Sequence, residues 1–243
     1  MTQDLHTPQP QAPTPAQPES LARKAWPYWL LLLILLIIDQ AIKIWVKTHM
    51  YIGQEHRVFE WFRIYFVENE GMAYGMKLGS KLFLTLFRLL AMSAGTYILY
   101  KSIPNRALKG FPWVITLILA GGIGNIIDSV FYGPLFSSSI GAVAQFAPAG
   151  GGYAPWFMGH VVDMFYFPLY HTTLPSWLPW MGGEPYTFFS PIFNFADACI
   201  SVGVIITLLF YGKQAAMAID GAYNAFRALF VRRKEHRNPS DHH

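Results

Sequence analysis

Long apolar runs alternate with shorter polar segments along most of the chain. Four of these runs cover residues 25–46, 82–100, 111–128 and 192–211. Each is close to the length that a helix needs to cross the hydrocarbon core of a bilayer, which is about 20 residues. Shorter apolar segments, such as 161–170, contain proline and cannot span. The pattern therefore predicts four membrane-spanning helices.

The two ends of the chain differ from the apolar region, which we expect to form one membrane domain over residues 23–213. Residues 1–22 are rich in Pro and Gln and contain no apolar run, as is typical of a disordered tail. Residues 214–243 form a basic tail that we expect in the cytoplasm. Its stretch 214–235 mixes phenylalanine and leucine with arginine, which is compatible with an interfacial helix or with a solvated tail.

Lysine and arginine in short flanks indicate the orientation of membrane spans, because they stay on the cytoplasmic side. They stand before the first span, between the second and third, and after the fourth: Arg23, Lys24, Lys101, Arg106, Lys109 and Lys213. With four spans these flanks share one side, so both termini are predicted to be cytoplasmic. The long loops 47–81 and 129–191 then face outward. We expect an all-α integral membrane protein, a four-transmembrane-helix bundle with a small extracytoplasmic β-rich cradle or loop region.

The composition supports a membrane protein and excludes several other classes. Only 13% of the 243 residues are charged, against about 25% in an average soluble domain. The net charge is +4 and the chain has a single cysteine, which excludes a disulfide framework and any CxxC motif. Basic runs occur only near the C-terminus, so binding to nucleic acid has little support.

The predicted topology gathers polar residues at one depth, near the outer ends of the spans. These residues are Asp39, Arg88, Asn125, Asp128, Asn194 and Asp197, and Asp163 follows in the outer loop. An aspartate at the centre of a membrane helix costs about 2.5–3.5 kcal/mol on insertion scales. Several such residues in one layer therefore indicate a functional site.

Each of these residues also has a structural interpretation. A single aspartate in the outer turn of a span can be hydrated at the interface. Lys43 and Arg88 can snorkel or act as counter-charges, and Asn125 and Asn194 can bridge helices. The glycines at 121–124 permit close helix packing, and they lack the Lys and Ser/Thr that a phosphate loop requires.

A pair of aspartates is the strongest chemical option. Two carboxyl groups that lie close together cannot both ionise cheaply, so they share a proton, and one acts as base while the other acts as acid. Four aspartates near one layer give six pairs, and the residues alone do not choose among them. His160 lies near Asp163 in the sequence, but no second ligand stands at a spacing typical of zinc sites. The serines lack a G-x-S-x-G context.

Five segments stand out in this order: D-Q-A-I-K at 39–43, V-E-N-E-G-M-A-Y-G at 67–75, G-G-I-G-N-I-I-D at 121–128, G-H-V-V-D-M-F at 159–165 and F-N-F-A-D-A-C-I at 193–200. Together they resemble the motifs of the bacterial lipoprotein signal peptidases (signal peptidase II). The second resembles the family's N-x-G-x-A segment, the third its G-G-x-G-N-x-x-D segment, and the fifth its F-N-x-A-D-x-x-I segment. Together they are specific, whereas N-x-G-x-A alone is weak.

The resemblance implies a four-span aspartic endopeptidase of the bacterial inner membrane. Such an enzyme removes the signal peptide of a prolipoprotein just before a diacylglyceryl-modified cysteine, with its active site toward the outer face. It implies Asp163 and Asp197 as the catalytic pair, without a metal or a cofactor. The residues that would bind substrate or support the site are Asp39, Lys43, Asn69, Gly71, Asn125, Asp128, Asn194 and Ala196. The implied partners are prolipoproteins and membrane phospholipids, and the expected state is a monomer.

Two departures from the family pattern stand out. The family usually has Arg directly after the aspartate of the third motif, but this chain has Ser129; Arg88 is a candidate replacement. Residues 131–158 and 171–190 form long inserts. They are compatible with a cap over the site, a lipid-binding segment, a partner-binding segment or mobile filler.

A second class of function stays open at this point. A small transporter or lipid-binding scaffold can also use intramembrane acids, as a proton or ion path. Such proteins tend to distribute acids through the depth of the membrane and to contain repeated halves. Here the acids collect in one predicted layer and no internal repeat is visible, which favours the peptidase.

Overall fold

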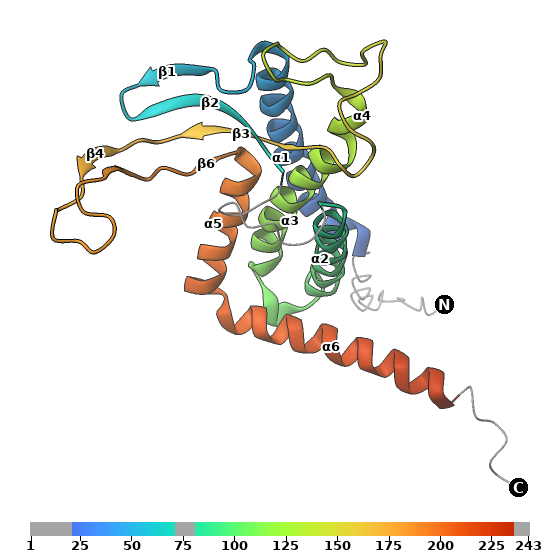
Figure 1. Ribbon diagram of the computed structural model, residues 1–243. Helices are drawn as coiled ribbons and strands as arrows, with labels where there is room; N and C mark the ends of the chain where they lie inside the picture. Colours follow the sequence, from blue (N-terminus) through green and yellow to red (C-terminus); the bar gives the residue numbers. More distant parts are fainter. Residues whose placement is uncertain (1–20, 71–80, 236–243) are drawn as a thin grey trace, which may run out of the picture.

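The computed structural model describes residues 21–70 and 81–235. Helices form one part of the molecule and a small sheet lies across one end of them (Figure 1). The long helices are α1 (Leu21–His49), α2 (Lys81–Ser102), α3 (Phe111–Ile127), α5 (Phe195–Phe210) and α6 (Gly212–Glu235). The predicted tail 1–22 lies almost entirely outside the described residues, as do Gly71 and the last residues of the C-terminal tail.

Helix α3 is the centre of the helical part. It contacts α1, α2 and α5, and most of its side chains are buried. The outer helices instead expose large apolar side chains, such as Ile37 on α1 and Leu90 on α2. An exposed apolar belt of this kind is compatible with lipid as the surrounding solvent. Among the described residues, α1, α2 and the segment Phe111–Leu135 are long and apolar enough to cross a membrane.

The fourth apolar run differs from the single helix expected over 192–211. Ile192–Phe193 form strand β6, α5 begins at Phe195, and the helix ends at Phe210. Tyr211 leaves the helical conformation, with φ −126° and ψ 18°, and α6 continues at an angle of 101°. The bent pair counts as a fourth span only if both helices are taken together.

The predicted C-terminal stretch 214–235 is helical, as part of α6, and the helix starts slightly earlier, at Gly212. The side chains at 226 and 229–235 are not among those described. Figure 1 shows α6 running across the end of the bundle that lies opposite the sheet. Its position at a membrane surface stays a prediction.

The described strands form two antiparallel sheets. The larger has the order β1 (Glu55–Phe59), β2 (Phe62–Asn69), β3 (Val161–Tyr166) and β6, and the smaller pairs β4 (Tyr170–Thr173) with β5 (Pro185–Phe188). Val67 pairs with Asp163, and Glu68 pairs with Val162. Because side chains alternate between faces, Asn69 and Asp163 share one face of the sheet, whereas Glu68 lies on the other.

Two hydrophobic clusters stabilise the fold. The first lies among α1, α2, α3 and α6 and includes Leu99, Phe111 and Leu119. The second lies under the sheet, where Val46 and Met50 at the end of α1 meet Phe66, Phe136, Ala144 and Val162. The 131–158 insert supplies several of these buried side chains, so it is a packed part of the fold. α3 is extended into the insert through a π-helical turn, Asp128–Tyr132, and the short helix α4, Gly133–Leu135.

Candidate active site

Asp163 projects from β3 on the side of the sheet that faces the helix ends. It is 3% exposed. Its Oδ1 accepts a hydrogen bond of 2.7 Å from Nδ2 of Asn194, and its Oδ2 accepts one of 3.3 Å from Nδ2 of Asn69. Both oxygens of this carboxyl group are therefore held by side-chain amides from two different segments.

Asp197 lies in the first turn of α5, and its position is fixed by the cap of that helix. Asn194 is the N-cap: its Oδ1 accepts from the backbone N–H of Asp197 at 2.8 Å, and Oδ2 of Asp197 accepts from the backbone N–H of Asn194 at 3.3 Å. This reciprocal capping box satisfies two donors that a helix start otherwise leaves unpaired. Asn194 thus contacts both aspartates: its side-chain amide nitrogen donates to Asp163, and its capping hydrogen bonds hold Asp197.

Asn125 of α3 joins this pair to a buried lysine. Its Nδ2 donates to Oδ1 of Asp197 at 2.7 Å. Its Oδ1 accepts from Nδ2 of Asn194 at 3.1 Å and from Nζ of Lys43 at 2.9 Å. The orientation of this amide is fixed from both ends, because its oxygen faces donors and its nitrogen faces a carboxylate.

Lys43 lies beneath the asparagines as the cation between two aspartates. It is completely buried, and its Nζ lies 3.0 Å from Asp39 and 2.9 Å from Asp128. Gln40 donates to both carboxylates, at 3.0 Å and 3.1 Å. A buried charge is tolerated only when it is paired and its hydrogen bonds are satisfied, and this cluster meets that condition.

The two aspartates of this cluster also hold other parts of the site. Oδ1 of Asp39 accepts from the backbone N–H of Ala196 at 3.0 Å, at the start of α5. Oδ2 of Asp128 accepts from the backbone N–H of Val162 at 3.2 Å, directly before Asp163. The cluster therefore binds the backbone next to Asp197 on one side and next to Asp163 on the other.

Glycines on α3 make this close arrangement sterically possible. A Cβ atom at Gly121 would lie 2.2 Å from the carbonyl oxygen of Ala196, and one at Gly124 would lie 2.6 Å from Oδ2 of Asp39. The glycines thus let α5 and the Asp39 side chain approach α3, as the helix-packing interpretation of 121–124 predicted.

Asp163 and Asp197 differ in burial, and the pKa of Asp163 is raised. Burial, followed by the negative charge of Asp197, raises the pKa of Asp163 to about 7, although the hydrogen bonds from Asn194 and Asn69 act in the opposite direction. Asp197 is only half-buried. Near neutral pH the carboxyl group of Asp163 is thus poised to hold a proton, and Asp197 is the more exposed of the two.

Comparison with known proteins identifies the family. A sequence model of signal peptidase (SPase) II matches residues 31–212. A protein of Porphyromonas gingivalis, named lipoprotein signal peptidase, is 56% identical over 192 residues, which cover 79% of this chain and 85% of that protein. The chain belongs to the signal peptidase II family.

Two further similarities agree with this membership. A lipoprotein signal peptidase of Amoebophilus asiaticus is 35% identical, over 78% of this chain and 79% of its own. A solved structure described as a bacterial membrane enzyme superposes with a TM-score of 0.53 at 23% identity, over 78% of this chain and 90% of the other. The latter shows a shared fold. Together with the apolar helices, these matches show that the peptidase is a multi-pass membrane protein.

A second buried network lies on the other face of the sheet, and the sequence pattern did not predict it. Glu68 of β2 contacts Lys47 of α1, the hydroxyl of Ser139 at 2.9 Å and Nδ1 of His160 at 3.0 Å. Burial alone would raise the pKa of Glu68, but the hydrogen bond with His160 and the charge of Lys47 hold it at about 2. The only available signal was the spacing of Asp39, Lys43 and Lys47, which places all three on one helical face.

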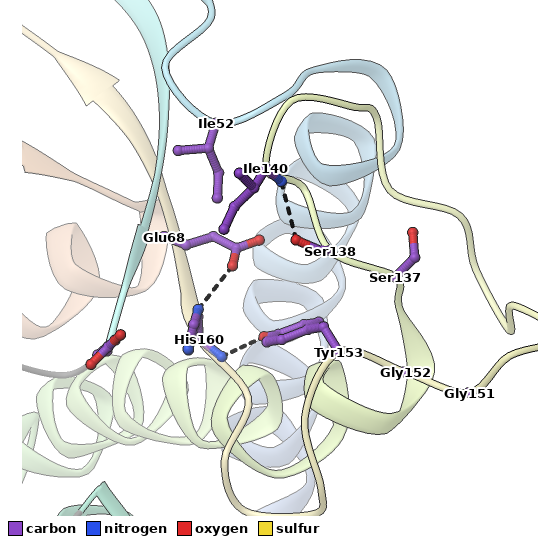
Figure 2. Close-up of a pocket in the computed structure, with 10 residues that line it drawn as sticks. Ile52, Glu68, Ser137, Ser138, Ile140, Gly151, Gly152, Tyr153 and His160 are labelled. Atoms are coloured by element: carbon purple, nitrogen blue, oxygen red, sulfur yellow. Dashed lines mark hydrogen bonds and ion pairs between the residues drawn. The ribbon is translucent and has the colours of Figure 1, made fainter.

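Figure 2 shows part of this network, in which His160 lies between Glu68 and Tyr153 of the insert. The hydroxyl of Tyr153 accepts from the backbone N–H of His160 at 2.6 Å, and Nζ of Lys47 lies 4.8 Å from the centre of the Tyr153 ring. A pocket of about 600 Å³ lies beside them, lined by Glu68, Tyr153 and His160 among others. The insert therefore contacts α1 and β2 on the face of the sheet opposite to the Asp163 side chain.

The ring of His160, which was considered above as a zinc ligand, forms a hydrogen bond with Glu68 in this structure. Within residues 21–70 and 81–235, no three His, Cys, Asp or Glu side chains lie together in a way that suits a metal ion. His160 therefore has a structural role, because its ring joins β2 to the start of β3, the strand that carries Asp163.

Ser129 does not supply the charge that the family usually has after the third-motif aspartate. It is buried, and its hydroxyl donates to the carbonyl oxygen of Asn125 at 2.9 Å, within its own helix. Arg88 of α2 interacts electrostatically with Asp197, Asp163 and Asp128. A cation is thus present near the carboxylates, but it comes from a different helix.

Proposed function

We propose that this peptidase removes the signal peptide of prolipoproteins by aspartyl catalysis, with Asp163 and Asp197 as the catalytic pair. The observation that carries the proposal is the contact of Asn194 with both aspartates, by its side chain and by its helix cap. Aspartic proteases activate water between two carboxyl groups that share a proton. Membership of the signal peptidase II family supplies the reaction class and the substrate.

In this proposal the shared proton resides on Asp163 and Asp197 acts as the base. Asp163 is the more deeply buried of the two, and its pKa is raised to about 7 by burial and by the charge of Asp197. Asp197 removes a proton from a water molecule, whose oxygen attacks the carbonyl carbon of the scissile amide. Asp163 donates a hydrogen bond to the carbonyl oxygen. When the C–N bond breaks, the proton taken by Asp197 passes to the amine of the lipid-modified cysteine.

The remaining site residues position this pair. Asn69, Asn125 and Asn194 hold the carboxyl oxygens in fixed directions. Lys43 neutralises Asp39 and Asp128, and these aspartates hold the backbone of Ala196 and Val162. Such preorganisation removes much of the entropic cost of reaching the reactive geometry. Gly71 keeps the role that the family resemblance implies, outside the described residues.

We also propose the orientation in which the sheet and the aspartates face outward from the bacterial inner membrane and both chain termini are cytoplasmic. The basic flanks support this orientation, and in it α6 lies along the cytoplasmic leaflet, where its bend of 101° from α5 suits an interfacial helix. Residues 23–213 then form the membrane domain, with residues 192–211 as the fourth span. A site at the edge of the bilayer admits both water and a lipid-bearing substrate. We expect the protein to act as a monomer in contact with phospholipids.

The substrate is tested with purified full-length protein and two peptides of one sequence. One carries diacylglyceryl on the cysteine after the scissile bond and the other carries a free cysteine. The proposal predicts cleavage of the first, before the modified cysteine, and little cleavage of the second. Equal cleavage of both peptides would contradict the substrate class. A second candidate function, transport, has no observation in its favour.

A further inference from the structure

We propose that the β4–β5 hairpin, residues 169–189, lies in the lipid headgroup zone of the leaflet on the sheet side and anchors that side of the molecule to the bilayer. The proposal uses only the surface of the hairpin and the membrane-spanning character of the chain. It therefore stands apart from the assignment of the catalytic pair.

The tip of the hairpin exposes aromatic side chains to an unusual degree. Trp180 is 101% exposed and Trp177 is 77% exposed, and Met181 beside them is 51% exposed. Glu184 is the only Asp, Glu, Lys or Arg in the whole segment 169–189. Tryptophan and tyrosine are enriched at the membrane–water boundary because one end of each ring is apolar and the other can form hydrogen bonds.

The hairpin has little support from the rest of the described structure. β4 and β5 form a two-stranded sheet of their own, with Tyr170 opposite Phe188 and Thr172 opposite Tyr186. An isolated two-stranded hairpin is only marginally stable in water. A hairpin with this many exposed aromatic rings is expected to need an apolar partner, and the surrounding lipid provides one.

The base of the hairpin continues an aromatic surface at the edge of the main sheet. The ring of Phe189 packs on Phe193 at 6.1 Å and on Phe167 at 6.5 Å. Trp61, in the turn between β1 and β2, lies 6.2 Å from Phe167. Figure 1 shows the β1–β2 and β4–β5 hairpins projecting to the same side of the molecule. The exposed rings thus belong to one region.

This region lies next to a surface that lipid must cover. β6 leads through Asn194 directly into α5, and the second half of α5 exposes Ile205, Leu208 and Leu209. The hairpin comes just before β6, so it lies at the opposite end of α5 from these exposed side chains. Because a bilayer covers the apolar face, its headgroup zone lies at the level where the helix starts, which is the level of the hairpin base. Continuity with the membrane surface therefore favours lipid as the partner that covers the hairpin.

The test places a fluorescent probe at the tip. The chain has one cysteine, so Cys199→Ala gives a background without thiols. Trp180→Cys in this background is labelled with a polarity-sensitive fluorophore, and the full-length protein is placed in phosphatidylcholine nanodiscs. Some discs contain a lipid with a nitroxide near the headgroup, and iodide serves as the quencher in water. Ala149→Cys, at an exposed position of the 131–158 insert, is the matched control, and Trp177→Cys is a second tip position.

The proposal predicts that the nitroxide lipid quenches labels at 180 and 177 about threefold more than a label at 149, in line with an interfacial aromatic anchor. Iodide should show the reverse order. Lipid quenching at 180 and 177 no greater than at 149 would overturn the proposal. Shielding of the tip labels from both quenchers would also overturn it, because the hairpin would then be covered by protein, from this chain or from a second copy.

Discussion

The side-chain amide of Asn194 donates to Asp163 at 2.7 Å and so joins β3 to the N-cap of α5. Asn194 is completely buried. Because the same residue caps α5 and so fixes Asp197, helix capping and the alignment of the two aspartates depend on one side chain.

Asn194→Ala is expected to lower both stability and activity. Loss of the cap should cost about 1 kcal/mol of unfolding free energy, and misalignment of the pair should reduce kcat about 100-fold. The amide stabilises the charged form of Asp163, so its loss should raise the pKa of Asp163 further and move the pH profile of cleavage upward. Asn105→Ala is the matched control, because Asn105 caps a short helix elsewhere. An unchanged pH profile in Asn194→Ala would contradict the role assigned to this amide.

Lys43→Met should be severely destabilising. It leaves Asp39 and Asp128 buried without their cation, and breaking a buried pair in this way costs about 3–5 kcal/mol. Thermal unfolding in detergent is the measurement. Lys43→Met combined with Asp39→Asn and Asp128→Asn should recover part of the loss, because the uncompensated charges are gone. If Lys43→Met alone melted like the parent protein, the cluster would not be the structural support described here.

Gly124→Ala should reduce both folding and cleavage, because the added methyl group would meet Oδ2 of Asp39 at 2.6 Å. Overpacking of a filled site costs about 1–3 kcal/mol. Gly221→Ala on α6 is the control, because a Cβ atom there meets nothing within 4 Å. It should be neutral or stabilising by up to about 1 kcal/mol. Equal effects of the two substitutions on melting temperature would argue against close packing at Gly124.

The raised pKa of Asp163 predicts a link between stability and pH. Burial, then the charge of Asp197, raises this pKa from an ordinary 3.8 to about 7, so the folded state favours the protonated form. Stability is therefore lost as the pH rises from the ordinary value through about 7, by up to about 4 kcal/mol. Asp163→Asn removes this penalty.

The melting temperature of Asp163→Asn should accordingly exceed that of the parent protein by more at about pH 8 than at about pH 5. Asp220→Asn, at an exposed position on α6, should show no such difference. A constant gap between Asp163→Asn and the parent across this pH range would contradict the raised pKa.

The sequence was sufficient for the family and the reaction class, because Asp39, Asn125, Asp128, Asn194 and Asp197 stand in motifs whose spacing is specific. Their convergence at one depth also followed from the topology alone, since consecutive spans run in opposite directions. The matches to signal peptidase II confirm the family prediction. The roles of individual residues stay predictions.

Features that depend on tertiary contacts were not visible in the sequence. Hydropathy extends the fourth run back to Ile192, but Ile192 and Phe193 pair with β3 instead, because a sheet edge competes with the helix for their backbone. The bend at Tyr211 falls at the end of the apolar run, next to Gly212, but nothing in the sequence gives its angle. The network of Lys47, Glu68 and His160 joins three distant segments, and composition alone gives no reason to pair them.

Asp163 and Asp197 are proposed as the catalytic pair, and this pairing is tested by cleavage of a diacylglyceryl-cysteine signal peptide by three purified variants. Asp163→Asn and Asp197→Asn should each lower kcat by at least about 1,000-fold, since residues that act as a unit fail together. Asp220→Asn should cleave like the parent protein, and all three should remain folded. Cleavage at the parental rate by either Asp163→Asn or Asp197→Asn would contradict the assignment of the catalytic pair.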